Sequence, residues 1–146
     1  MKLLISLFLF TISVSTAEWL TDFSKAQQQA GQDKKMILLN FSGSDWCGPC
    51  IRMRKEIFGA DVFNTYAVEH LVLVHADFPR LKKNQLSKEQ TKQNEALADK
   101  YNREGKFPFT VLLNSNGKVI KQWDGLPDES PESFVEEVKK VFNAVN

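Results

Sequence analysis

Cys47 and Cys50 are the only cysteines in the 146-residue chain, and two residues separate them. A disulfide between them would close a very short loop, so it would remove little conformational entropy from the unfolded chain and add little stability. At the start of a helix, positions i and i+3 lie about 5–6 Å apart, which matches the usual Cα separation of a disulfide. The spacing therefore predicts a reversible redox pair rather than a structural crosslink.

The position of the pair predicts which cysteine attacks. Pro49 is tolerated in the first turn of a helix, so we expect a helix to begin at the pair. Unpaired N–H groups and the helix dipole at that end favour a thiolate, and Cys47 lies closer to the end than Cys50. We expect Cys47 to attack a partner disulfide and Cys50 to resolve the mixed disulfide. Gly48 leaves room for a substrate backbone, and Trp46 either shields the thiol and contacts substrate or only packs.

The surrounding pattern predicts one α/β domain with a central mixed β-sheet flanked by helices on both sides. The predicted strands are 36–41, 71–76, 109–113 and 119–123, and the predicted helices are 19–32, 49–57, 61–69, 88–102 and one that begins at Ser130-Pro131. The first helix is expected to have Thr21 or Asp22 as its N-cap and to end near Gly31. The Asn-Gly turn 114–117 predicts a hairpin between the last two strands.

Residues 1–17 have the pattern of a secretory signal peptide. Lys2 is followed by an apolar run over 3–12, and Ser15-Thr16-Ala17 offers a cleavage site after Ala17. The alternative, a membrane anchor, is disfavoured because a span takes about 20 apolar residues. We therefore expect a mature domain over 18–146, exported to the periplasm or the extracellular space, without stable membrane insertion after cleavage.

Charge excludes one class of partner. Removal of residues 1–17 removes one lysine and leaves 18 basic and 18 acidic residues, so the mature chain is formally neutral. A neutral chain lacks the basic footprint of a nucleic-acid-binding protein. The local excess of cations at Arg80, Lys82, Lys83 and Lys88 is interpreted as a solvated loop. We expect a monomer without a bound cofactor.

Trp46-Cys47-Gly48-Pro49-Cys50 after a buried strand resembles the active site of the thioredoxin family, and the resemblance covers nearly all of residues 19–146. Residues 41–46 are similar to the exported bacterial branch of single-domain thioredoxin-like proteins. The resemblance implies a thioredoxin fold and thiol–disulfide exchange with protein substrates. Phe107-Pro108 is similar to the family's cis-proline site, which implies that both residues bind the substrate peptide, and Gly125 matches a further family position.

The chain departs from the family at a buried position. Thioredoxins carry a buried Asp that helps to deprotonate the resolving cysteine, whereas the nearest match here is Asn40, and the interval to Cys47 is one residue longer. Asn does not exchange protons near neutral pH. Asp45, His75 and Asp77 are the candidate replacements, although an ordinary polar role at the surface or at a strand end is the favoured interpretation of each. Of the three, His75 is the most interesting, because its unperturbed pKa of about 6.5 suits a proton shuttle.

Three alternatives concern the reaction itself. The Gly-Pro dipeptide between the cysteines resembles reducing thioredoxins and implies a reductase, which outside the cytoplasm needs electrons from a membrane partner. The opposite direction, as an oxidase or isomerase, stays open, and so does a non-catalytic binding or chaperone module. A structural zinc site is disfavoured because it needs four ligands. The histidines His70 and His75 flank a predicted strand without the usual spacing of zinc ligands.

Overall fold

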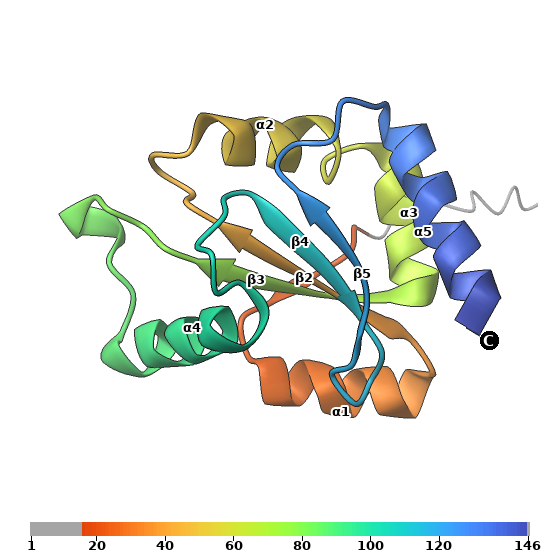
Figure 1. Ribbon diagram of the computed structural model, residues 1–146, viewed down its shortest axis with the longest axis horizontal. Helices are drawn as coiled ribbons and strands as arrows, with labels where there is room; N and C mark the ends of the chain where they lie inside the picture. The colour runs from red at the N-terminus through yellow and green to blue at the C-terminus, as the bar shows by residue number, and fades with distance from the viewer. Residues whose placement is uncertain (1–15, 146) are drawn as a thin grey trace, which may run out of the picture.

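The computed structural model describes residues 16–145, which form a five-stranded sheet covered by helices (Figure 1). The strands are β1 (Trp19–Leu20), β2 (Met36–Ser42), β3 (Leu71–Asp77), β4 (Phe109–Leu113) and β5 (Val119–Asp124). Their order is β1-β3-β2-β4-β5, with β1, β3 and β2 parallel and β4 and β5 antiparallel to their neighbours. The predicted mixed sheet is confirmed.

Helices lie on both faces of the sheet. The helices are α1 (Phe23–Asp33), α2 (Gly48–Glu56), α3 (Asp61–His70), α4 (Lys88–Tyr101) and α5 (Pro131–Val145). Figure 1 shows α1 and α4 on one face and α2, α3 and α5 on the other. Alternate residues of β2 point to opposite faces, so Leu38 packs with Phe63 and Phe134 while Leu39 packs with Ala26 and Leu97. Two apolar cores therefore fix the central strand that leads into the cysteine pair.

The start of the domain differs from the prediction. Trp19 and Leu20 were expected to open a helix, but they form β1, which pairs with Leu73 and Val74. Trp19 packs against the core below α2 and Leu20 against the opposite core, so the two residues alternate with the period of a strand. The helix begins only after Asp22, whose carboxylate caps it by accepting the Lys25 N–H, as one of the two expected caps.

The end of α1 and the turn between β4 and β5 can be compared with the predictions from the sequence. Helix α1 ends two residues after the expected end near Gly31, because it continues to Asp33 and has Lys34, with φ of 54°, as its C-cap. The hairpin between β4 and β5 is confirmed, with Gly117 at φ of 81° in its turn. That φ favours glycine, which has no Cβ to clash there.

The strand directions bring the predicted site residues to one edge of the sheet. Ser42 ends β2 beside Asp77 at the end of β3, and Phe41 pairs with Phe109 at the start of β4. The turn into α2, the end of β3 and Pro108 therefore meet at this edge. No helix among residues 16–145 is long and apolar enough to cross a membrane. The signal peptide predicted over residues 1–17 lies almost wholly outside the described residues.

Candidate active site

The cysteine pair lies at the N-terminus of α2. Cys47 is the N-cap residue and Gly48 and Pro49 form the start of the helix, where a proline without an N–H is tolerated. Cys47 and Cys50 are joined by a disulfide with a Cα separation of 5.2 Å. Both cysteines are buried, with exposed fractions of 5% and 3%, whereas Gly48 and Pro49 between them are exposed. The exposed surface next to the buried sulfurs is therefore formed by Gly48 and Pro49.

The helix N-terminus acts directly on the sulfur of Cys47. The backbone N–H of Cys50 donates to the Cys47 Sγ over 3.3 Å, so the sulfur occupies the place of an N-capping oxygen. In the reduced protein the same N–H and the helix dipole favour negative charge on that sulfur. This arrangement supports Cys47 as the attacking thiolate.

The turn from β2 into α2 requires a glycine. The carbonyl oxygen of Gly43 accepts the N–H groups of Trp46 and Cys47, which closes the turn immediately before the pair. The Trp46 indole lies against the Cα of Gly43, and a Cβ at this position would overlap the ring. The turn and the Trp46 indole therefore pack as one unit.

Trp46 is the centre of an aromatic cluster beside the disulfide. Its Nε1 donates to the carbonyl oxygen of Phe78 over 2.7 Å, and its ring lies 5.5 Å from the ring of Phe107. Phe78 and Phe107 also contact each other edge to face, at 5.4 Å. The Arg80 guanidinium carbon lies 3.6 Å from the centroid of the indole ring. Trp46 therefore both packs and forms part of the surface around the pair.

The cluster joins the cysteine turn to the segment before β4. The Phe107–Pro108 peptide bond is cis, and the Pro108 carbonyl oxygen accepts the N–H of Gly125. Phe107 is partly buried between Trp46 and Phe78, which brings two distant predicted site segments together. Gly125, with φ of 81°, is the residue that ties the end of β5 to Pro108.

Two of the three candidate proton partners are engaged elsewhere. The Asp45 carboxylate accepts the N–H groups of Arg80 and Leu81 and the side-chain amide of Asn84. The Arg80 N–H is the largest cause that lowers the pKa of Asp45. Asp77 accepts both the N–H and the hydroxyl of Ser44 and thereby braces the turn. Each carboxylate orders backbone near the pair.

The third candidate, His75, lines a small cavity to which α2 contributes Arg54. The cavity has a volume of about 50 Å³ and is lined by Trp19, Asn40, Ser42, Arg54, Phe58 and His75. His75 pairs in register with Asn40 on the neighbouring strand. Burial lowers the pKa of His75, and the Arg54 charge lowers it further, while the Asp77 charge raises it. His75 is therefore held toward its neutral, proton-accepting form.

Asn40 itself is part of the packing rather than a titratable group. It is buried, and its side-chain amide donates to the Thr110 hydroxyl over 2.9 Å. The Thr110 hydroxyl in turn contacts the sulfur of Met53 on α2. This chain of contacts links β2 and β4 to α2, the helix that carries Cys50.

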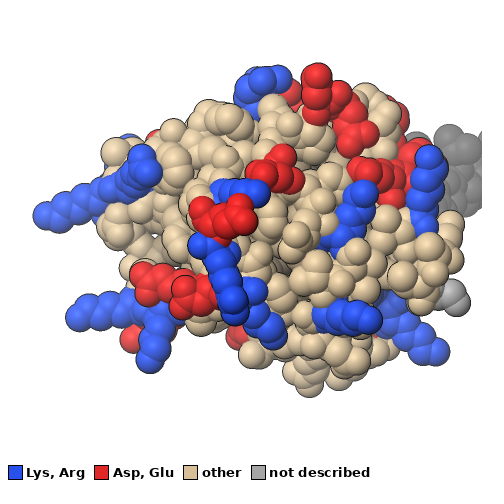
Figure 2. All heavy atoms as spheres, in the orientation of Figure 1, with Lys and Arg blue, Asp and Glu red and all other residues tan. Residues whose placement is uncertain are grey.

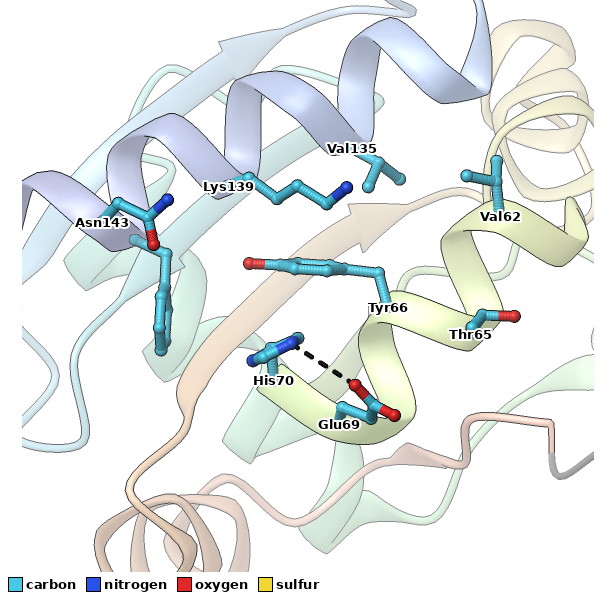
Figure 3. A pocket seen from close by; sticks show the side chains of 9 residues that line it. Val62, Thr65, Tyr66, Glu69, His70, Val135, Lys139 and Asn143 are labelled. Atoms are coloured by element: carbon cyan, nitrogen blue, oxygen red, sulfur yellow. Dashed lines mark ion pairs between the residues drawn. The ribbon is translucent and has the colours of Figure 1, made fainter.

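A larger hollow lies between α3 and α5, away from the cysteines. It has a volume of about 500 Å³, and its lining includes Tyr66, His70 and Lys139 (Figure 3). The Tyr66 ring lies between His70 below and Lys139 above, and its buried hydroxyl has no hydrogen-bond partner among residues 16–145. None of the predicted site residues lines this hollow. Among residues 16–145 no group of three or more His, Cys, Asp or Glu side chains is placed to hold a metal ion.

Sequence reasoning missed four contributors to the site: Gly43, Phe78, Arg80 and Arg54. Phe78, Arg80 and Arg54 act on residues far away in the sequence, so local spacing carries no signal for them. Gly43 contacts Trp46 three residues later within the turn, and the sequence pattern did not single it out. Arg80 belonged to a run of cations with no recognisable spacing.

The fold and the redox pair define a thioredoxin-like protein, and comparison with known proteins agrees. The model of a thioredoxin-like domain matches residues 23–142. A solved thioredoxin from Thermus thermophilus superimposes with a TM-score of 0.66 over 87% of this chain and 88% of its own, at 16% identity, which supports the fold alone. The chain therefore belongs to the thioredoxin-like family.

Within this family the chain is similar to a particular oxidoreductase. It is 34% identical to the disulfide bond reductase DsbH of Chlamydia pneumoniae over 131 residues, which are 90% of this chain and 76% of DsbH. A solved DsbH oxidoreductase superimposes with a TM-score of 0.81 at 30% identity and covers 94% of each chain. The thioredoxin-related protein DsbJ of the same organism is 30% identical over 70% of this chain but only 28% of its own length. The protein is a DsbH-like thiol–disulfide oxidoreductase.

Proposed function

We propose that the protein reduces disulfides in exported proteins. The observation that carries the exchange chemistry of this proposal, in either direction, is the Cys47 sulfur at the N-cap of α2, where it accepts the Cys50 N–H. A sulfur held in this way is stabilised as a thiolate, which is the attacking species in exchange. The similarity to a protein described as a disulfide bond reductase supports the direction. The Gly-Pro dipeptide supports it as well.

The reaction moves two electrons from the pair to the substrate. The Cys47 thiolate attacks one sulfur of the substrate disulfide, forms a mixed disulfide and releases the other substrate sulfur as a thiolate. Cys50 then loses its proton and attacks the Cys47 Sγ, which releases the second substrate thiolate. The products are a substrate dithiol, after protonation, and the Cys47–Cys50 disulfide of the structure. A membrane electron donor then restores the dithiol.

His75 is the proposed acceptor of the Cys50 proton. Arg54 lines the cavity that contains His75. Arg54 follows Cys50 by one helical turn, so Cys50 and Arg54 lie on the same face of α2. A neutral imidazole in this cavity is able to accept a proton near neutral pH. If the rate of mixed-disulfide resolution has the same pH dependence in His75→Ala as in the unsubstituted protein, this role is excluded. His70→Ala, in the hollow between α3 and α5, is the matched control.

The substrate peptide is proposed to lie across the exposed Gly48-Pro49 surface, against Trp46, Phe107 and Pro108. The Trp46–Phe107 contact supports this placement, because it brings the segment before β4 to the cysteine turn. Open space in front of Gly48 leaves room for a second backbone.

Export is proposed from residues 1–17 as a signal peptide cleaved after Ala17, which places the mature domain over 18–146 in the periplasm or outside the cell. The test is the N-terminal mass of the protein purified from cells after expression with its own leader. A chain that begins at Glu18 supports cleavage, and a retained Met1 in the membrane fraction contradicts it.

Equilibration with glutathione decides the direction of the reaction. A reductase is expected to have a potential close to the value of about −270 mV for thioredoxin. A potential above about −180 mV would overturn the reductase assignment and favour an oxidase or isomerase.

Trapping identifies the substrates. Cys50→Ala is expected to accumulate Cys47 mixed disulfides in cells, whereas Cys47→Ala traps none and has no activity. Activity retained by Cys47→Ala would instead point to a binding module.

A further inference from the structure

The segment between β3 and α4, residues 78–87, is termed the basic loop. It contains Arg80, Lys82 and Lys83 and no acidic residue, and its centre is the short 3-10 helix η1 (Lys82–Asn84). The sequence alone suggested a solvated loop. We propose that the basic loop is a docking arm for protein substrates whose disulfide is flanked by carboxylates and an apolar side chain. This inference rests on the proposed function and specifies its substrate class.

The basic loop is fixed to the cysteine turn. Both oxygens of the Asp45 carboxylate bind it, accepting the Arg80 N–H over 2.9 Å and the Leu81 N–H over 3.0 Å. Asp45 also accepts the Asn84 amide, and the Gln85 amide donates to carbonyl oxygens within the loop. Asp45 precedes Cys47 by two residues. The loop is therefore an ordered attachment to the active-site turn.

The contact with Trp46 places one cation beside the redox pair. The Arg80 guanidinium stacks on the indole of Trp46, the residue directly before Cys47. Such stacking holds the guanidinium in place while its edge can still donate hydrogen bonds. A carboxylate near the attacked sulfur would therefore meet a positioned donor.

The cations of the basic loop are free to bind an external anion. The ion pairs of residues 16–145 use other basic residues, including Arg52, Lys106, Lys121 and Lys139, and none uses Arg80, Lys82 or Lys83. The two nearby carboxylates are engaged with other groups, since Asp45 accepts backbone N–H groups of the basic loop and Asp77 accepts the N–H of Ser44 in the cysteine turn. Figure 2 shows basic side chains projecting from the left edge of the molecule, the end at which η1 lies in Figure 1.

Two exposed apolar side chains lie on the segments beside the cysteine pair, one in the basic loop and one in α2. Leu81 in the basic loop is 48% exposed, and Ile51, directly after Cys50, is 49% exposed. Large apolar residues exposed to this extent are few in residues 16–145, and the others, Val119 and Val145, lie at the far edge strand and at the end of α5. The combination of cations with exposed leucine and isoleucine fits an extended protein segment with acidic and apolar residues.

The test compares the reduction of matched substrates by the unsubstituted protein. Short peptides with one disulfide and one leucine differ only in the flanking residues, which are Glu, Ser or Lys. At low salt the Glu peptide is expected to react about tenfold faster than the Ser peptide, and added NaCl should remove the difference because it screens the attraction. The Lys peptide should be slowest. Bis(2-hydroxyethyl) disulfide, which is small and uncharged, reports on exchange chemistry alone.

Reversing the charge of two lysines tests whether the preference for the Glu peptide arises from the basic loop. Lys82→Glu/Lys83→Glu should abolish or invert the ratio of Glu to Ser peptide rates, whereas Lys25→Glu/Lys140→Glu, with the same charge change on α1 and α5, should preserve it. Equal rates for the Glu and Ser peptides at low salt, with the small disulfide still reduced, would overturn docking and leave the proposed function intact. Failure to reduce any disulfide overturns the proposed function instead. Binding of the loop to anionic vesicles, without a peptide preference, would assign it to a membrane and also overturn the proposal.

Discussion

At the scale of single residues, Gly43 has the sharpest steric requirement in the cysteine turn. A Cβ at Gly43 would overlap the Trp46 indole, whereas a Cβ at Gly48 meets no atom within 4 Å. Gly43→Ala is therefore expected to lower the free energy of unfolding by about 1–3 kcal/mol, as overpacking does elsewhere. Gly48→Ala is the matched control and should leave stability within about 0.5 kcal/mol. Urea unfolding measures both, and equal stability of the two variants would contradict the packing described for Trp46.

His75 gives the stability of the protein a specific pH dependence. Burial, the largest effect, lowers the pKa of His75 in the folded protein, while in the unfolded chain it lies near about 6.5. As the pH falls below about 6.5, the unfolded chain takes up a proton that the folded protein resists, so the free energy of unfolding should fall. His75→Gln should flatten this part of the curve. The lowered pKa values of Asp45 and Glu137 act only at more acidic pH, so an unchanged slope in His75→Gln would rule out the assignment.

At the scale of elements, the basic loop depends on one carboxylate. Asp45→Ala removes the acceptor of the Arg80 and Leu81 N–H groups, so hydrogen exchange at these two amides should accelerate by roughly tenfold or more. Asp22→Ala is the control, because that carboxylate also accepts a backbone N–H but caps α1. Exchange rates at Arg80 and Leu81 that are equal in the two variants would show that other contacts order the loop.

Most elements were predictable because their signals are local. The run 36–41 is apolar except for Asn40, Asn114 to Gly117 form a turn, and Pro49 begins a helix, so β2, the hairpin and α2 follow from the sequence with shifts of one or two residues at their ends. β1 was missed because two residues are too few to reveal a period of two. Its pairing with Leu73 and Val74 depends on the tertiary structure and leaves no local pattern in the sequence.

The site was predictable to a smaller extent than the fold. The spacing of Cys47 and Cys50 identified the redox pair, because the chemistry needs only those two residues and a helix start. The engagement of Asp45 and Asp77 with backbone groups was not visible, since it depends on where the loop after β3 returns. The Arg80–Trp46 stack joins residues 34 positions apart and has no sequence period.

At the scale of the whole molecule, we expect a monomer. The sheet ends on one side in β1, which has only two residues, and on the other in β5, where a register shift interrupts the pairing with β4 near Leu112. Lys121 on β5 forms an ion pair with Glu137 of α5. Sedimentation equilibrium should give the mass of one chain under reducing and oxidising conditions. A dimer that persists in reductant would contradict this expectation.

The same two outer strands have a consequence for behaviour in concentrated solution. An unpaired edge strand can form backbone hydrogen bonds with the edge strand of another copy, and short, bulged or charged edge strands discourage this pairing. Among residues 16–145, β1 is very short, and β5 carries Lys121 and Asp124 and is irregularly paired with β4, so both outer strands have features that discourage pairing between copies. We therefore expect no ordered aggregates to form through repeated cycles of oxidation and reduction of the cysteine pair, which lies at α2 and away from both outer strands.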